Sequence, residues 1–348
     1  MKKRTILLLL IVLAAASGLY AGGQTENPEP ASKIDKPLFT FIDGKGNESV
    51  FYHEIERIVV VNSGLSALLA ALQQSDKIVG RDMFSSFPSS LRTKKVVGKS
   101  SAYPNLELIL GSKPDVVMAD AMFDDSVAEK LAALGIPVLI ESTSNPLKTK
   151  ELVTRYGDLL DCEERAAEIC AWLDEADSRI AGLIETARVN GENAPVVFFE
   201  NRKNYKSTSK KSSTHQYLEL SGGVNIAADE KVSSPTLSPE FIVEKNPNVI
   251  IRRVSGDLTA DTMAGVRDNI LNRPGLSATQ AVSTERVFVI KADLFMTIRY
   301  PSALFYHASW FYPETFRNED PEEFNKELIN FMFGDGEFEK TNEAFAYP

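Results

Sequence analysis

The chain of 348 residues is poor in the side chains that form metal sites and disulfides. It contains two cysteines and three histidines. His53, His215 and His307 lie far apart and lack the spacing of a site for a bare metal ion, which needs several nitrogen or sulfur ligands placed together. If Cys162 and Cys170 share one helix, their Cα atoms are roughly 12 Å apart, too far for a disulfide. We therefore expect no direct metal ligation and no disulfide.

The sequence also lacks the patterns of common catalytic sites. GxSxG, HExxH and Walker motifs are absent, as is a glycine-rich phosphate loop. The formal net charge is −10, so no basic face can dominate and nucleic acid is excluded as a general partner. These absences favour a protein that is not an enzyme and needs no cofactor.

A long apolar run occurs at the N-terminus, at residues 6–16, after the basic residues 2–4. The run is too short to span a bilayer comfortably, and small residues follow at positions 21–23. This pattern predicts a signal peptide over residues 1–23, cleaved between Ala21 and Gly23, and export to a periplasm. Residues 24–36 are polar and contain prolines, as is typical of a tether.

From residue 37 the sequence alternates between β-branched apolar runs and amphipathic segments. Glu56–Val61 (ERIVVV) is predicted as a buried strand, and residues 38–53 alternate around Asp43-Gly44 as a hairpin does. A second alternating series starts at residue 192. Alternation of this kind predicts parallel sheets with helices on both faces. We assign an N-terminal α/β lobe to residues 37–145 and a C-terminal one to residues 192–348.

An internal repeat supports two equivalent lobes. Asn105–Met118 reads NLELILGSKPDVVM and Ser238–Ile251 reads SPEFIVEKNPNVII. Without a gap, Glu107 meets Glu240 and Pro114 meets Pro247. Each copy is predicted to form a helix, a turn and a strand.

The segment between the lobes, residues 146–191, is predicted to be helical. Asp161–Val189 has apolar residues at the i, i+3, i+4, i+7 spacing of one helix face. Asp161 and Glu164 form the pattern of a capping box, and Gly191 stands where a helix would end. At 1.5 Å per residue this helix is roughly 40 Å long. We expect a clamshell of two Rossmann-like lobes joined by this helix, with ligand bound where the carboxyl ends of the strands face each other.

In these motifs and their order, the chain resembles the helical-backbone periplasmic binding proteins of ABC importers for iron–siderophores, haem and cobalamin, a family with a molybdate- and tungstate-binding branch. The resemblance runs from about Phe39 to Phe333. It implies a monomer that captures a small anionic ligand, delivers it to a permease dimer, and meets the membrane only through that permease. It also implies that Glu107 and Glu240 dock onto permease arginines. Alternatively, both carboxylates only favour the N-termini of their helices, by about 0.3–1 kcal/mol.

The ligand is expected to contact the loops that follow the strands. The loop of residues 201–211 is basic within an acidic chain, which suits an anion, although a solvated loop explains it equally well. In the cobalamin-binding member Phe84 has an aromatic counterpart, but two tryptophan positions correspond to Ser101 and Ser234. The candidate ligand-binding residues are Asn62, Ser63, Arg81, Phe84, Tyr103, Arg202, Tyr205, Lys206, Arg299 and Tyr300.

A ferric chelate of the siderophore type fits these residues first, with molybdate or tungstate as the alternative. A tight oxyanion pocket would use Asn62, Ser63, Tyr103 and Arg299. A ligand-sensing receptor or an enzyme in the same cleft is the alternative from a different class. Because the long helix restricts the hinge, we expect only a small closure on binding.

Overall fold

The structure is a computed structural model that describes residues 36–256, 258–341 and 344–348. Contacts divide the chain into two units, 1–36 and 37–348, and the fold below is that of the second unit. The predicted signal peptide lies outside the described residues, as does the tether apart from Lys36. Among the described residues, no helix has both the length and the apolar character needed to cross a bilayer.

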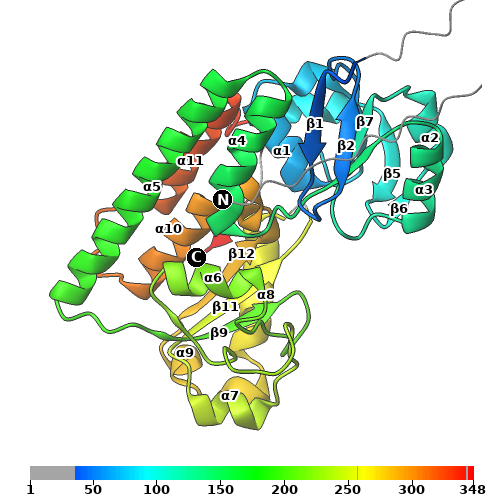
Figure 1. The fold of residues 1–348 in the computed structure, drawn as a ribbon. Coiled ribbons are helices and arrows are strands. Elements are labelled where there is room, and N and C mark those ends of the chain that lie inside the picture. Colours follow the sequence, from blue (N-terminus) through cyan, green and yellow to red (C-terminus); the bar gives the residue numbers. More distant parts are fainter. Residues whose placement is uncertain (1–35, 257, 342–343) are drawn as a thin grey trace, which may run out of the picture. The chain divides into compact units, whose positions relative to one another are not determined.

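The first elements form a hairpin and a six-stranded sheet (Figure 1). Strands β1 (Phe39–Ile42) and β2 (Glu48–Phe51) pair antiparallel, as the turn at Asp43-Gly44 predicts. The sheet has the order β6-β5-β4-β3-β7-β8 and is parallel except where β6 pairs with β5. Its strands are β3 (Ile58–Val60), β4 (Ile78–Asp82), β5 (Val96–Ser100), β6 (Tyr103–Pro104), β7 (Val116–Ala119) and β8 (Val138–Ile140).

Both faces of this sheet are buried because successive side chains of each strand point to opposite sides. Ile58 and Val60 belong to one apolar cluster together with helix α1 (Ser63–Ala71). Val59 belongs to another, with α2 (Leu106–Gly111) and α3 (Asp125–Ala133). This arrangement explains why the segment reads as a continuous apolar run.

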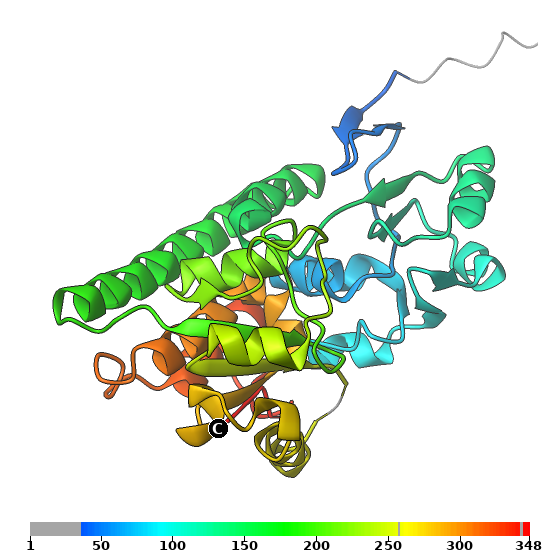
Figure 2. The same ribbon diagram turned by 90° about the horizontal axis from the view of Figure 1, so that it is seen from below.

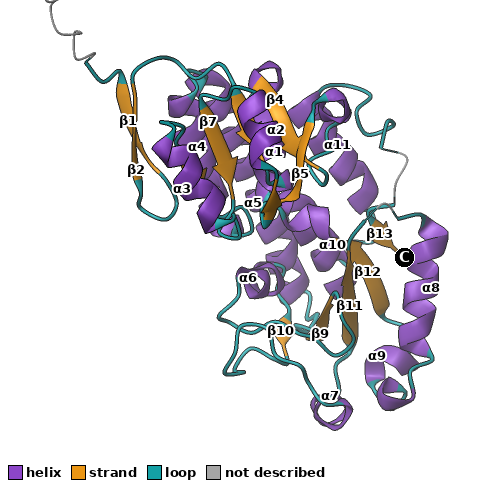
Figure 3. Cartoon of the chain, turned by 90° about the vertical axis from the view of Figure 1, so that its right-hand side faces the viewer, coloured by secondary structure: helices purple, strands orange, loops and turns teal. Residues whose placement is uncertain are grey.

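The second sheet repeats the design in the order β10-β9-β11-β12-β13, with β13 antiparallel at one edge. Helices α6 and α10 cover one face, while α7, α8 and α9 cover the other (Figure 3). The strands are β9 (Val196–Asn201), β10 (Val224–Asn225), β11 (Val249–Val254), β12 (Val287–Lys291) and β13 (Ala346–Tyr347). The helices are α6 (Ser213–Leu220), α7 (Pro239–Lys245), α8 (Ala260–Leu271), α9 (Gln280–Ser283) and α10 (Tyr300–Phe311).

Helices α4 (Thr149–Leu159) and α5 (Glu163–Val189) connect the two sheets in sequence, and α11 (Pro321–Phe333) follows α10. The long helix α5 is seen along its length in Figure 2. It ends before Gly191, whose φ is +86°, as predicted. The predicted start at Asp161 is wrong. Asp161 has a left-handed φ of +55° and Cys162 is the N-cap without a side-chain bond, so no capping box forms.

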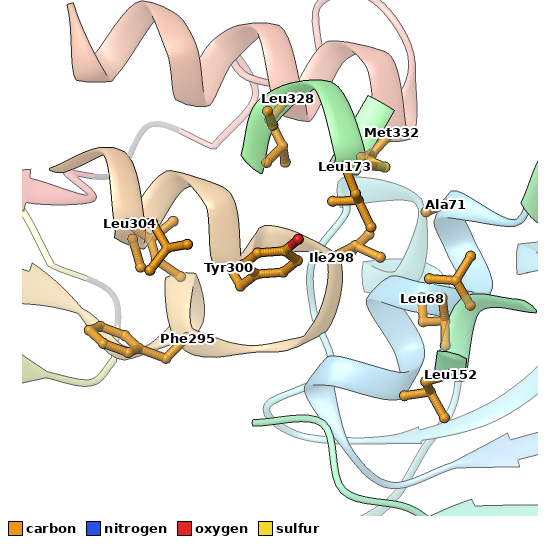
Figure 4. Packing of buried hydrophobic residues seen from close by; sticks show 14 of the residues in the cluster. Leu68, Ala71, Leu152, Leu173, Phe295, Ile298, Tyr300, Leu304, Leu328 and Met332 are labelled. Atoms are coloured by element: carbon orange, nitrogen blue, oxygen red, sulfur yellow. The ribbon is translucent and has the colours of Figure 1, made fainter. Parts of the chain in front are cut away.

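The two sheets share one apolar core. Its members come from both sheets, from α1, α4, α5, α10 and α11, and from the segment between β12 and α10. Figure 4 shows the part of this core that the helices and that segment contribute. That segment consists of two 3₁₀ turns, Ala292–Phe295 and Thr297–Arg299. The Thr297 hydroxyl donates to the carbonyl of Gly64 at 2.6 Å. Further 3₁₀ turns are Ser75–Lys77, Ser89–Thr93, Pro146–Lys148 and Pro274–Leu276.

Candidate functional site

The first sheet has its topological switch point between β3 and β7, because the chain runs from β3 to β4 on one side and returns to β7 on the other. Asn62 follows β3 and Asp120 follows β7, and the Asn62 Nδ2 donates to Asp120 Oδ2 at 2.9 Å. The Asn62 Oδ1 also accepts from the Leu65 amide at 2.9 Å, which caps α1. Ligands of open parallel sheets bind outside the strand ends at such a point.

Large exposed apolar side chains stand at or after the carboxyl ends of several strands of this sheet. Met83 and Phe84 follow β4, Tyr103 pairs with the last residue of β5, and Met122 follows β7. Phe84 is 63% and Tyr103 71% exposed, and both methionines are more than half exposed. Exposed apolar groups gathered in one place mark a binding surface. We call Asn62, Met83, Phe84, Tyr103, Asp120 and Met122 the N-sheet edge.

A buried polar layer lies next to this edge. Asp82 at the end of β4 is buried, and burial, reinforced by nearby Asp120, raises the pKa of its carboxyl although it accepts from the Ser85 amide at 2.8 Å. Arg81 was also predicted to contact ligand, and the structure places its side chain within the protein. Its guanidinium is buried, with Nε donating to the Leu91 carbonyl at 2.7 Å. Arg81 therefore holds the loop that follows β4.

The basic loop after β9 carries both exposed and packed side chains. Arg202 is exposed and has a left-handed φ of +59°. Tyr205 is half-buried, with its ring 5.0 Å from the guanidinium of Arg273. Lys206 is half-buried and its backbone pairs with Thr236. Of the three predicted residues in this loop, Arg202 is the one that is exposed.

Arg253, near the end of β11, was not predicted. It is buried with its guanidinium 5.3 Å from the ring of Phe295, and burial, with a smaller contribution from the neighbouring charge of Arg202, lowers its pKa to about 10. The described residues provide no hydrogen bond to its Nε. The run VIIRRV could have signalled this position, because arginine is seldom buried without a charged partner. We call Arg202 and Arg253 the C-sheet edge.

Arg299 and Tyr300, two further residues predicted to contact ligand, are both buried. Arg299 is 3% exposed and its guanidinium lies between the rings of Phe87 and Phe345, at 4.4 and 5.0 Å. Burial lowers its pKa to about 10. Tyr300 is buried and its hydroxyl donates to the carboxylate of Asp177 on α5 at 2.8 Å. Neither side chain faces an open surface.

Glu107 and Glu240 occupy equivalent places, as the repeat predicts. Each is the second residue of its helix, α2 or α7, and each is exposed. The preceding caps also match, since Asn105 accepts from the Leu108 amide and Ser238 accepts from the Phe241 amide.

Histidine and carboxylate side chains are not gathered into a metal site within the described residues. His215 is buried, with Nδ1 3.0 Å from Asn225 Nδ2 and Nε2 3.2 Å from a Glu219 oxygen. His307 is fully buried among aromatic rings. Both histidines therefore pack within the protein.

The chain is similar to binding proteins with several different ligands. It is 25% identical over 258 residues to a cobalamin-binding protein of Halobacterium salinarum, covering 72% of this chain and 69% of that protein. A periplasmic haem-binding protein of Pseudomonas aeruginosa superposes with a TM-score of 0.66 at 22% identity, covering 75% and 94%. The molybdate-binding protein MolA of an ABC transporter of Haemophilus influenzae gives 0.68 at 16% identity, covering 85% and 98%.

The two structural likenesses confirm the predicted fold class, two parallel sheets flanked by helices. The sequence relatives are substrate-binding proteins and not enzymes. A family model described as periplasmic binding protein matches residues 58–294, more than half of the sequence. The chain belongs to the periplasmic binding protein family.

Proposed function

We propose that this protein captures a metal chelate between its two sheet edges and delivers it to an ABC import permease. The chelate has an organic framework and anionic groups, and a ferric siderophore is the class that we expect first. The observation that carries the proposal is the exposed apolar set of the N-sheet edge, Met83, Phe84, Tyr103 and Met122. A bare oxyanion such as molybdate needs hydrogen-bond donors in a tight pocket, and it would leave these side chains uncovered.

The C-sheet edge supports the anionic part of the proposal. Arg202 is exposed and Arg253 lacks a carboxylate partner among the described residues. Arginine pairs with carboxylate and catecholate-like oxygens through planar N–H groups. A ligand that contacts both edges would cover apolar surface on one side and neutralise cationic charge on the other.

The binding test uses a thermal-shift panel with a ferric hydroxamate, a ferric catecholate, haemin, cobalamin, molybdate and tungstate. A ligand present at 100 times its dissociation constant stabilises the protein by roughly 2.7 kcal/mol, a readily measured shift. We expect a shift with one chelate class. A shift with the two oxyanions alone would contradict the proposal.

The N-sheet edge is tested by Phe84→Ala and Tyr103→Ala, with Leu134→Ala as the control. Leu134 is similarly exposed but caps the C-terminus of α3. Covering an aromatic side chain contributes about 1.5–3 kcal/mol, so each edge variant should bind roughly 10- to 150-fold more weakly. Equal affinities for edge and control variants would place the ligand elsewhere.

Delivery is tested with the double variant Glu107→Ala/Glu240→Ala. We expect uptake to fall while chelate affinity stays unchanged, because rim charges set orientation and association rate more than affinity. The matched control is Glu129→Ala/Glu244→Ala, which removes exposed glutamates from α3 and α7. Unchanged uptake in the docking variant would contradict docking through these residues and favour a sensing role.

A further inference from the structure

A polar cavity lies at the carboxyl end of the second sheet, on the side covered by α8. It has a volume of about 330 Å³. Its polar wall is formed by Asn204 from the loop after β9, Arg252 from β11, Thr262 and Asn269 from α8, and Arg273 after α8. Gly265 of α8 also lines it, and a Cβ added there would meet no other atom within 4 Å. The cavity lies at the switch point between β9 and β11, where open sheets bind ligands.

Next to the cavity is a fully buried carboxylate, Glu200. It accepts from Arg252 Nη1 at 2.7 Å, from Arg273 Nη1 at 2.6 Å and from the Tyr205 amide at 2.6 Å. One carboxylate therefore faces two guanidinium groups, which leaves one positive charge in excess. Asn204, Thr262 and Asn269 add uncharged polar groups, so no second carboxylate lines the cavity.

The two guanidinium groups carry more N–H donors than their bonds use. The Nε atoms of Arg252 and Arg273 are buried and make no hydrogen bond with the described residues. Arg273 as a whole is only 9% exposed. These Nε atoms are closed to solvent, but each Nη group carries two N–H donors, and an anion in the cavity can accept those that Glu200 and the Arg202 carbonyl leave unused.

We propose that this cavity is a binding site for a small oxyanion, one carrying one or two carboxylate or phosphate groups. Its occupancy stabilises the loop after β9, because Arg252 Nη2 also donates to the carbonyl of Arg202 at 2.6 Å. That loop holds Arg202 and Tyr205 at left-handed φ values of +59° and +62°, a conformation that costs free energy for residues other than glycine. The cavity is separate from the proposed chelate site in its lining, since no residue of the N-sheet edge or the C-sheet edge lines it.

The test follows the arginine Nε–H signals in nuclear magnetic resonance spectra of the mature protein. Inorganic phosphate, sulfate, malonate and citrate are titrated separately at constant ionic strength with chloride as the reference anion. We expect saturable shifts of the Arg252 and Arg273 signals with at least one of these anions. Anion affinity should fall when the salt concentration rises, because salt screens the attraction between charges at a partly exposed site.

Two glycine variants separate binding from folding. Gly265→Leu places a side chain in the cavity opening, and a Cβ at this position meets no other atom within 4 Å. Gly182→Leu on α5 is the matched control, another exposed helical glycine with free space around its Cβ. Both changes replace glycine by a good helix former, so both variants should fold. We expect Gly265→Leu to weaken anion binding at least tenfold and Gly182→Leu to leave it unchanged.

Three results would overturn the proposal. The first is a linear response of the Nε–H signals to every anion, which indicates bulk ionic effects. The second is equal anion affinity in Gly265→Leu and in the unmodified protein. The third is saturable binding that shifts signals of other arginines while those of Arg252 and Arg273 stay constant.

Discussion

Replacing Arg299 by methionine should stabilise the protein. The guanidinium is enclosed by Phe87 and Phe345, and its Nε and Nη2 atoms make no hydrogen bond with the described residues. Burial lowers the pKa of Arg299 to about 10, and the nearby Asp293 offsets this only in part. At 1.36 kcal/mol for each tenfold change in the proton equilibrium, ionised Arg299 costs the folded state about 3 kcal/mol.

Methionine has a similar length, carries no charge and contacts aromatic rings favourably. The variant loses two cation–π contacts, which offset about 1–2 kcal/mol of the gain. We therefore expect the free energy of unfolding to rise by about 1–2 kcal/mol in urea titrations at pH 7. The matched control is Arg317→Met, because Arg317 is exposed and pairs with Glu314 on the surface. A surface change of this kind should stay within about 0.5 kcal/mol.

The stability gained by Arg299→Met should depend on pH in a definite direction. Because the folded pKa of Arg299 lies below the unfolded one, the charged group destabilises the folded state at neutral pH, and this cost is relieved as the pH rises through about 10. The advantage of Arg299→Met over the unmodified protein should therefore shrink above that pH. A loss of stability in the variant would refute this reasoning. A tenfold loss of chelate affinity would instead show that ligand reaches Arg299.

Two further changes test the buried charges. Glu200→Gln leaves Arg252 and Arg273 without their carboxylate, so the free energy of unfolding should fall by about 3–5 kcal/mol in urea, and a loss below 1 kcal/mol would contradict the pairing. Burial raises the pKa of Asp82, so stability present at low pH is lost as the pH rises through its folded pKa. Asp82→Asn should therefore gain in melting temperature relative to the unmodified protein as the pH rises above about 4, the ordinary pKa of an aspartate, and parallel pH profiles would contradict this.

The sequence predicts the layered fold well because its strongest signals are local. Ile58, Val59 and Val60 are all apolar because the strand is covered on both faces. The repeat around Glu107 and Glu240 predicts equivalent helices because cap, helix and strand lie within fourteen residues of each other. Elements defined by short-range patterns of this kind need no knowledge of distant contacts.

The site residues are harder to predict because their surroundings depend on distant parts of the chain. Tyr300 is buried, and its hydroxyl bonds to Asp177, which lies 123 positions away in the sequence. Arg299 is enclosed by Phe87 and Phe345, which come from opposite ends of the folded unit. Periodicity places such residues near the carboxyl ends of strands, but it does not distinguish a side chain that faces ligand from one that faces the protein.

Both sheets are mainly parallel, but they present different chemistry at their carboxyl ends. The first presents exposed methionine and aromatic side chains, while the second presents arginines, two of them buried. A ligand that is alike on all sides would gain little from this asymmetry, whereas an amphipathic chelate matches both edges at once. The exposed glutamates, by contrast, retain equivalent positions on both copies of the repeat. This pattern is expected if the ligand is asymmetric and the permease presents two similar subunits. An asymmetric ligand contacts two unlike sheet edges, whereas two similar permease subunits contact two equivalent glutamates.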